Sequence, residues 1–182
     1  GQGAPLVPVG EKYLFSDYKT LINLGGFANI TKMSTSNLIA YDICPINTVF
    51  NHLASLIDLK YDDKGKIASS GKLNIDLFNH LQSLEYYKSF SPKSLSIEWV
   101  NDFINPTLNK FSELSTVDLL HTFSNHFAMQ ISDNIETNGK VLITGGGAYN
   151  DYLIQRIKDL TGSKIDIPDS IIIEYKEALI FG

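Results

Sequence analysis

The sequence has little cysteine, little basic charge and no long apolar run. Cys44 is the single cysteine among 182 residues, so no internal disulfide can form, which fits a reducing compartment. Lys and Arg number 15 against 20 Asp and Glu, a net charge of −5, so nothing attracts the whole chain to nucleic acid or to an acidic membrane. The sequence has no run of about 18 apolar residues that could span a bilayer, and its first residues lack the regions of a signal peptide. We therefore expect a cytoplasmic protein without nucleic-acid or membrane partners.

The residues that are present are those of a folded domain. Hydrophobic residues make up 43% of the chain, with 10 Phe and 9 Tyr, which argues against disorder. The length suits one domain with a core of its own. The chain lacks an initial Met, and a helical pattern at 175–181 stops at Gly182, so we expect a piece of a longer protein.

The first half predicts an antiparallel meander. Two apolar segments, 21–24 and 27–33, flank a Gly-Gly pair and read as a hairpin, and 37–41 reads as a third strand. Residues 42–47, which include Pro45, read as a loop, and Asn47 is positioned to cap the helix that follows. Residues 61–71 are polar and contain two glycines, so they read as a loop.

Apolar residues at helical spacing predict the remaining helices, at 48–59, 74–84, 97–104, 116–135 and 149–160, with a last one starting near 174. Pro106 is expected to end the third of these, and Ser115 or Thr116 to cap the fourth. Segments 140–144 and 164–167 read as strands. The order predicts an α/β domain with a mixed sheet: a meander followed by strand–Gly loop–helix units.

Gly25 and Gly26 form the first candidate site. Glycines at a hairpin tip allow positive φ and let backbone N–H groups approach a ligand, with Asn29 and Thr31 as further donors. An ordinary hairpin turn has the same composition. Taken alone, these residues favour the ordinary turn.

The second candidate is Gly145, Gly146 and Gly147, between a buried strand and a helix. A base or a phosphate can lie against a chain without Cβ atoms, and a helix N-terminus adds N–H donors. The pattern is neither a dinucleotide-binding fingerprint nor a P-loop. A tight turn is the alternative, but three glycines exceed what a turn needs, so ligand contact is favoured.

Asp42 is a third candidate, for a metal-bound phosphate or a sugar hydroxyl. A carboxylate that caps backbone amides in a loop is equally compatible with its position. The four histidines have no zinc spacing, and 61–68 lacks the acceptors of a calcium loop.

Six segments in order resemble one family. They are Gly-Gln-Gly-Ala-Pro-Leu-Val-Pro (1–8), Asn-Leu-Gly-Gly-Phe-Ala-Asn-Ile-Thr (23–31), Tyr-Asp-x-x-Pro-x-Asn (41–47), Pro-Lys-Ser (92–94), Gly-Gly-Gly-Ala-x-Asn (145–150) and Glu-Ala-Leu-x-Phe (177–181). Together they resemble the anhydro-N-acetylmuramic acid kinases, over essentially the whole chain.

The resemblance implies a ribonuclease-H-like lobe of the actin/hexokinase ATPase superfamily, with ATP and Mg²⁺ as cofactors. Residues 1–182 would form the C-terminal lobe of a two-lobe sugar kinase, without its N-terminal lobe. The family opens the 1,6-anhydro ring of anhydro-N-acetylmuramic acid with water and phosphorylates it to N-acetylmuramic acid 6-phosphate, in peptidoglycan recycling.

The resemblance also implies roles for individual residues, grouped by ligand. Nucleotide contacts fall on Gly25, Gly26, Asn29, Thr31, Gly145, Gly146, Gly147 and Asn150. Sugar contacts fall on Gln2, Gly3, Asp42 and Asn47. Glu177 supports catalysis, and the metal ligands stay unknown, with Asp42 and Glu177 as candidates.

Departures from the family pattern limit what this chain can do. The family's Gly-Thr-Ser-x-Asp-Gly phosphate loop does not occur, and the catalytic Asp lies upstream of the Gly1 position. Cys44 and Ser96 also depart from common family residues. We therefore expect the isolated chain to be inactive and to bind ATP weakly, with a homodimer partner or the missing lobe covering its cleft. A non-catalytic nucleotide-binding or interaction half-protein, or another carbohydrate or acetate-type kinase of the superfamily, stays open.

Overall fold

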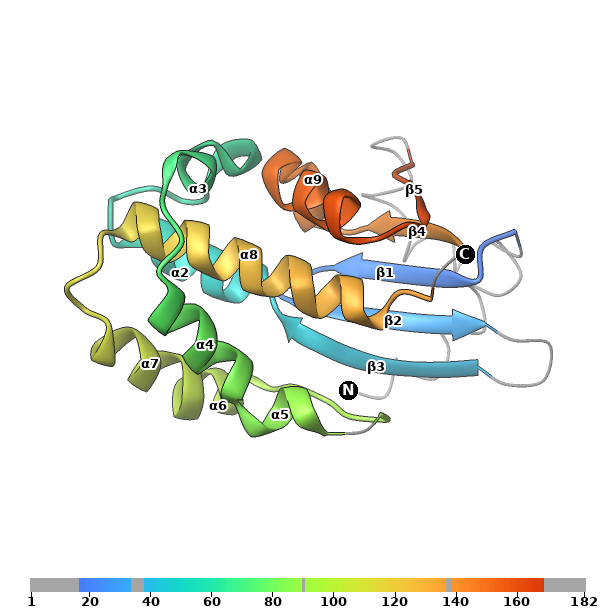
Figure 1. Ribbon diagram of the computed structural model, residues 1–182, viewed down its shortest axis with the longest axis horizontal. Coiled ribbons are helices and arrows are strands. Elements are labelled where there is room, and N and C mark those ends of the chain that lie inside the picture. Colours follow the sequence, from blue (N-terminus) through green and yellow to red (C-terminus); the bar gives the residue numbers. More distant parts are fainter. Residues whose placement is uncertain (1–16, 34–37, 90, 137–138, 169–182) are drawn as a thin grey trace.

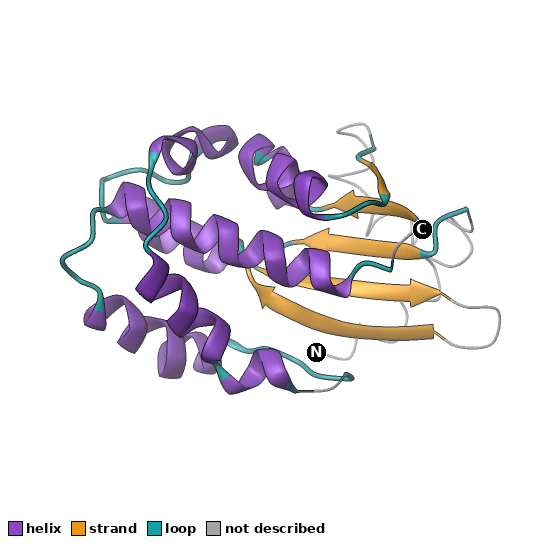
Figure 2. Cartoon of the chain, viewed as in Figure 1, coloured by secondary structure: helices purple, strands orange, loops and turns teal. Residues whose placement is uncertain are grey.

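The computed structural model describes residues 17–33, 38–89, 91–136 and 139–168. Their strands form one five-stranded sheet, and Figure 1 shows the helices crowded toward the end of the sheet where β1, β3 and β4 finish. The long helix α8 (Thr116–Asn134) runs alongside this sheet, as Figure 2 also shows. The part of the chain beyond 168, including the helix expected near 174, lies outside the described residues.

The sheet is mixed, as the sequence predicts. Strand order is β3-β2-β1-β4-β5, with the first three strands antiparallel and β1, β4 and β5 parallel to one another. The bounds are β1 Thr20–Leu24, β2 Phe27–Met33, β3 Leu38–Pro45, β4 Lys140–Thr144 and β5 Lys164–Asp166. The meander followed by strand–Gly loop–helix units is thus confirmed.

The helical segments lie mostly between β3 and β4. They are α2 (Asn47–Ser55), η1 (Asp63–Gly65), α3 (Lys66–Ser70), α4 (Ile75–Ser83), α5 (Glu85–Lys88), α6 (Ile97–Trp99), the π-helical η2 (Val100–Ile104), α7 (Asn105–Lys110), α8, η3 (Gly146–Tyr149) and α9 (Asp151–Leu160). The helices predicted at 74–84 and 116–135 are confirmed. Ser115 caps α8 by accepting the Asp118 N–H at 3.1 Å.

The core lies between one face of the sheet and the helices. Alternate residues of the hairpin strands, such as Ile22, Leu24 and Ile30, are fully buried because a strand turns successive side chains to opposite faces. They belong to one apolar cluster with Phe123 and Phe127 of α8. This packing fixes the carboxyl end of β1 beside the start of α2, and the carboxyl end of β4 beside η3 and the start of α9.

The predicted loop at 42–47 is wrong for its first half, because β3 continues to Pro45. Residues 42–45 pair with residues 27–29 of β2, and the Asp42 N–H donates to the Lys93 carbonyl at 3.0 Å on the outer side of this edge strand. Pro45 ends that edge strand, where a missing N–H is tolerated.

The predicted helix at 48–59 is too long, and its predicted cap is wrong. The helix starts at Asn47 itself, Ile46 occupies the cap position without a side-chain bond, and the last residue is Ser55. Asp58 has φ of 59°, a left-handed conformation that ends the helical path.

The predicted loop at 61–71 is wrong, because η1 and α3 occupy it. The Asp62 carboxylate accepts the N–H groups of Ile67 and Ala68, both at 2.9 Å, and so satisfies the start of α3. Gly65 has φ of +71° and lies against Asn150, and Gly71 lies against the Val117 carbonyl. The two glycines let this helical segment approach α9 and α8 closely on one side, while most of its other residues are exposed.

Pro106 does not end a helix, contrary to the sequence prediction. It sits in the first turn of α7, where no N–H donor is required, and the π-helical turn η2 precedes it. The helical path therefore continues through the proline to Lys110.

Candidate functional site

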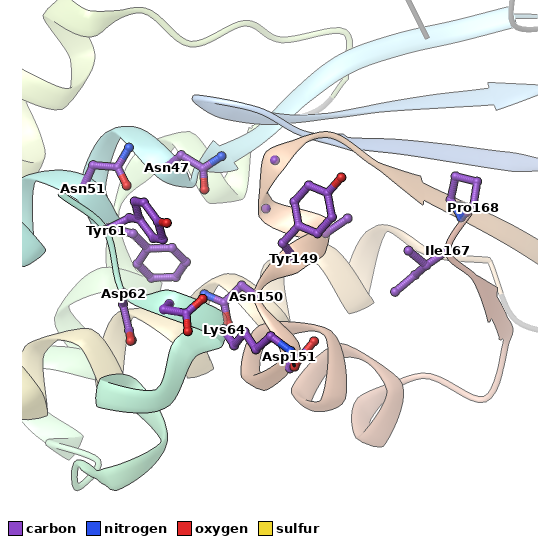
Figure 3. A pocket seen from close by; sticks show the side chains of 15 residues that line it. Asn47, Asn51, Tyr61, Asp62, Lys64, Tyr149, Asn150, Asp151, Ile167 and Pro168 are labelled. Atoms are coloured by element: carbon purple, nitrogen blue, oxygen red, sulfur yellow. Dashed lines mark ion pairs between the residues drawn. The ribbon is translucent and has the colours of Figure 1, made fainter. Parts of the chain in front are cut away.

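A pocket of about 690 Å³ opens beside the turn that follows β4. Its walls come from η3 and the start of α9, from the first turns of α2, from residues 61–64, and from Ile167 and Pro168, as Figure 3 shows. The segments 47–51, 61–64 and 146–151 are far apart in the sequence. The sheet brings them together because β1 joins the Gly25-Gly26 hairpin to β4.

The three glycines after β4 have different roles. Gly145 has φ of +84°, and a Cβ on it would meet the Asn23 side chain and the Leu24 carbonyl. A Cβ on Gly147 would lie 2.7 Å from the Leu24 Cβ, closer than real contacts allow. A Cβ on Gly146 would meet only Asn47 Nδ2, at 3.7 Å, an ordinary contact. Packing therefore requires two glycines, whereas Gly146 faces open space and lines the pocket.

The Gly25-Gly26 tip caps the start of α2 with its carbonyl groups. The Gly26 carbonyl accepts the Ile46 N–H at 2.8 Å and the Thr48 hydroxyl at 3.0 Å, and the Gly25 carbonyl accepts the Asn47 N–H at 3.3 Å. Peptide units are planar and trans, so the N–H groups of Gly26 and Phe27 point away from α2. The positive φ values expected here are absent, because Gly65 and Gly145 are the glycines with positive φ in the described part of the chain.

Asn29 and Thr31 lie along β2, behind that tip. Asn29 pairs with Asn23 of β1 and is partly buried, and Thr31 is only 4% exposed opposite Leu21. Neither residue lines the pocket. The nucleotide contacts of both residues stay predictions. A ligand would reach the Thr31 side chain less easily than the Asn29 side chain, because Thr31 is more deeply buried.

Asn47 and Asn150 face each other across the pocket, each with part of its amide engaged. Asn47 Nδ2 donates to the Leu24 carbonyl at 3.2 Å. Asn150 Oδ1 accepts the Leu153 N–H at 2.9 Å and so caps α9. The remaining atoms, Oδ1 of Asn47 and Nδ2 of Asn150, have no hydrogen-bond partner among the described residues, and both residues line the pocket.

Asp42 lies apart from the pocket, on the edge strand β3. Its Oδ2 accepts the Leu95 N–H at 2.8 Å, and its carbonyl accepts the Tyr86 hydroxyl at 2.6 Å. The carboxylate thus holds the segment at 93–95 against the sheet, and a contact with the sugar stays a prediction.

The charged residues around the pocket are mostly acidic. Asp62, Asp63 and Asp151 line it with Lys64, whose Nζ is 3.7 Å from an Asp151 oxygen with both side chains exposed. The Lys66 ammonium donates a hydrogen bond to Asp63 and lowers the pKa of that carboxyl. A polyphosphate would be repelled by this rim, whereas a neutral base or a ribose hydroxyl would not.

Sequence reasoning did not identify the aromatic residues of the pocket, which are the buried Phe50 and the two exposed tyrosines Tyr61 and Tyr149. Tyr61 is 57% exposed and Tyr149 is 44% exposed, and both line the cavity. Tyr149 is two residues after the last of the three glycines, within the Gly-Gly-Gly-Ala-x-Asn segment, and this position is a signal that could have marked it. Tyr61 carries no such signal, because its position depends on the packing of η1 and α3.

The predictions about metal ligands, about sugar-contacting residues near the N-terminus and about Glu177 can be compared only with the described residues. Among residues 17–33, 38–89, 91–136 and 139–168, no group of three His, Cys, Asp or Glu side chains could hold a metal ion. Gln2, Gly3 and Glu177 lie outside that part. No helix within it is long and apolar enough to cross a membrane.

Comparison with known families matches the whole chain. The family model described as "AnmK: Anhydro-N-acetylmuramic acid kinase" matches residues 1–182. Curated proteins of that name are 32% identical over 166 residues in Hydrogenovibrio crunogenus and 35% identical over 179 residues in Clostridioides difficile. These matches cover 87% and 88% of this chain but 45% and 46% of the relatives. The chain therefore spans about half the length of the curated relatives it matches.

Two solved structures share the fold at low sequence identity. An activator of the 2-hydroxyisocaproyl-CoA dehydratase from Clostridium difficile, with bound ADPNP, matches with TM-score 0.57 and 16% identity, over 96% of this chain and 62% of that one. Component A of the Acidaminococcus fermentans (R)-2-hydroxyglutaryl-CoA dehydratase matches with TM-score 0.59 and 14% identity, over 96% and 64%. These likenesses show an actin-like ATPase fold and nothing further.

Proposed function

The chain belongs to the anhydro-N-acetylmuramic acid kinase family, and on this premise we propose that it forms the nucleotide-binding C-terminal lobe of such an enzyme. The reaction proposed for the whole protein is ATP-dependent phosphorylation of 1,6-anhydro-N-acetylmuramic acid with hydrolytic opening of its ring. The product is N-acetylmuramic acid 6-phosphate, which fits a cytoplasmic role in peptidoglycan recycling.

One observation carries the proposal: Gly146 lacks a side chain although no contact among the described residues requires a glycine there. A Cβ there has room, in contrast to Gly145 and Gly147, and the space it would enter is the pocket. A ligand lying against the backbone at Gly146 explains the third glycine. A nucleoside suits the pocket, which combines aromatic rings, amide groups and an acidic rim.

The charge distribution orients the nucleotide. The acidic rim favours the base and ribose in the pocket, with the phosphates outside it. The Gly25-Gly26 tip is joined to the pocket through Asn47, whose N–H donates to Gly25 and whose side chain donates to Leu24. The outward N–H groups of Gly26 and Phe27 would then meet the phosphate groups.

Positioning is the contribution that this lobe can make to catalysis. Phosphoryl transfer depends mainly on holding the phosphate and stabilising its charge, and the backbone donors of the hairpin serve both purposes. Mg²⁺, when bound with ATP, would neutralise phosphate charge while keeping several of its waters. Asp42 and Glu177 are the proposed carboxylates on this chain, with Glu177 supporting catalysis and Asp42, Gln2 and Gly3 contacting the sugar. Asn47 lines the proposed nucleoside pocket, so its predicted sugar contact requires the sugar to lie beside that pocket.

The isolated chain is proposed to have no useful kinase activity. A general base contributes about 10²- to 10⁴-fold, and the family's catalytic Asp has no counterpart in this sequence. A second lobe, or a second copy of the chain, would complete the cleft. A turnover by the chain close to that of a whole family member would refute this.

Titration calorimetry of the chain with Mg-ATP tests the nucleotide site. Gly146→Val should abolish binding, because its side chain would fill the space beside the base. Gly162→Val is the matched control: a Cβ at Gly162 meets nothing within 4 Å and lies outside the pocket. Equal binding by both variants would place the nucleotide elsewhere. Binding by the chain, without turnover by the whole protein, would favour a non-catalytic nucleotide-binding or interaction half-protein.

A further inference from the structure

Three lysines lie side by side where the parallel strands β1, β4 and β5 begin. Lys140 and Lys164 are direct partners in the ladder between β4 and β5. Lys19 precedes Thr20, and Thr20 pairs with Val141, the residue after Lys140. The register therefore places Lys19, Lys140 and Lys164 in one row across three neighbouring strands, which we call the lysine row.

The lysine row lies at the end of the sheet away from the proposed nucleoside pocket. Figure 1 shows the starts of β1 and β4 at the end opposite to the helices. Lys140 begins β4 and Thr144 ends it, a length of about 13 Å, and the glycine turn comes only after Thr144. All three lysines are exposed. An anion held by them would therefore leave the nucleoside pocket free.

The charges of the lysine row are only partly compensated. Asp166 Oδ1 lies 3.6 Å from Lys164 Nζ, and Asp166 Oδ2 accepts the Tyr18 hydroxyl at 3.3 Å. No carboxylate in the described part of the chain forms an ion pair with Lys19 or Lys140. Like charges directly opposite each other destabilise a sheet, so this row costs the fold stability in a chain whose net charge is −5.

We propose that the lysine row is a binding site for a linear polyphosphate anion, independent of the proposed nucleotide site. Neighbouring strands are about 4.8 Å apart, so the three ammonium groups cover a span of about 10 Å. Each ammonium has three donors and is a common partner of phosphate oxygens. A single tetrahedral anion can bridge two of these side chains, whereas a chain of phosphates can reach all three.

Titration calorimetry with sodium tripolyphosphate tests the lysine row, with the ionic strength held constant by sodium chloride. The chain should bind tripolyphosphate more tightly than sulfate, which bridges fewer lysines. Lys140→Gln should weaken tripolyphosphate binding at least about tenfold, since a hydrogen bond to a charged group contributes a factor of this order. Lys140→Arg keeps the charge and should retain most of the affinity.

The melting temperature without any added polyphosphate gives a second, independent measurement. Lys140→Gln should melt about 1–4 °C above the parent chain, because the repulsion from its two neighbours is removed. Lys88→Gln is the matched control, since it removes the charge of an exposed lysine on α5. It should match the parent in melting temperature and in tripolyphosphate affinity.

Equal tripolyphosphate affinity in the parent and in Lys140→Gln would overturn the lysine row, because the anion would then bind elsewhere on the chain. An equal loss in Lys88→Gln would assign the binding to net charge and would overturn the row as well. Both free polyphosphate and the phosphate tail of a nucleotide have the required chemistry, and a titration with ATP separates them. A second bound ATP per chain that Lys140→Gln removes would identify a nucleotide tail, and its absence alongside Lys140-dependent tripolyphosphate binding would identify free polyphosphate.

Discussion

Replacing the buried His126 with Phe tests how the core limits stability in acid. His126 of α8 has no exposed surface, and neither ring nitrogen has a hydrogen-bond partner in the described part of the chain. Its neighbours are aromatic: the ring centroids of Tyr87 and Phe127 lie 4.8 and 5.6 Å away. Burial in these surroundings lowers the pKa of His126 to about 3.

The magnitude follows from the difference between folded and unfolded states. An unfolded histidine has a pKa near 6.5, so the folded pKa is lowered and the neutral ring is the folded form. The stabilisation is complete above about pH 6.5 and is lost as the pH falls toward 3, because the unfolded chain takes up a proton that the fold excludes. At pH 5 the loss from this one group is about 2 kcal/mol.

Urea unfolding at pH 7.5 and pH 5 measures this loss. The free energy of unfolding should fall between the two pH values by about 2 kcal/mol less in His126→Phe than in the parent chain. His52→Phe, on the exposed side of α2, is the matched control and should behave as the parent. An equal fall in the parent and in His126→Phe would refute the assignment of the acid sensitivity to this ring.

Three further changes test the packing around the pocket and core. Gly147→Ala should lower the melting temperature because its Cβ would collide with Leu24, at a cost of about 1–3 kcal/mol, whereas Gly146→Ala should melt as the parent does. Asn150→Ala should lose about 1 kcal/mol of unfolding free energy, since the cap of α9 is removed, and Asn150→Asp should keep most of it. Tyr87→Phe should leave urea stability unchanged or raise it, because the buried Tyr87 hydroxyl has no partner among the described atoms.

The sequence predicts the elements whose signals are local. The hairpin around Gly25 and Gly26, the strand before Gly145 and the helix capped by Ser115 each carry their pattern within a short stretch. A strand buries every second residue and an amphipathic helix every third or fourth, so the spacing of apolar residues in the sequence is enough to identify these elements. The mixed sheet follows from the order of these elements.

The errors fall where a distant residue decides the local structure. Residues 42–45 continue β3 because they pair with residues 27–29 of β2, and Lys93, some fifty positions later, accepts the Asp42 N–H on the outer side of this strand. The helical segment at 62–71, which contains η1 and α3, packs closely against α9 at Gly65 and against α8 at Gly71. A polar segment with two glycines has the composition of a loop, and only its neighbours in space show that the glycines serve packing.

The glycine motif shows the same limit at the site itself. Sequence reasoning takes three glycines as one signal for a ligand, but Leu24 and Asn23, over a hundred positions earlier, account for two of them. Asn47 and Asn150 are likewise divided between holding the fold and lining the pocket. Of the three glycines, Gly146 is the one that packing leaves unexplained, and it is therefore the one to which we assign the proposed ligand contact.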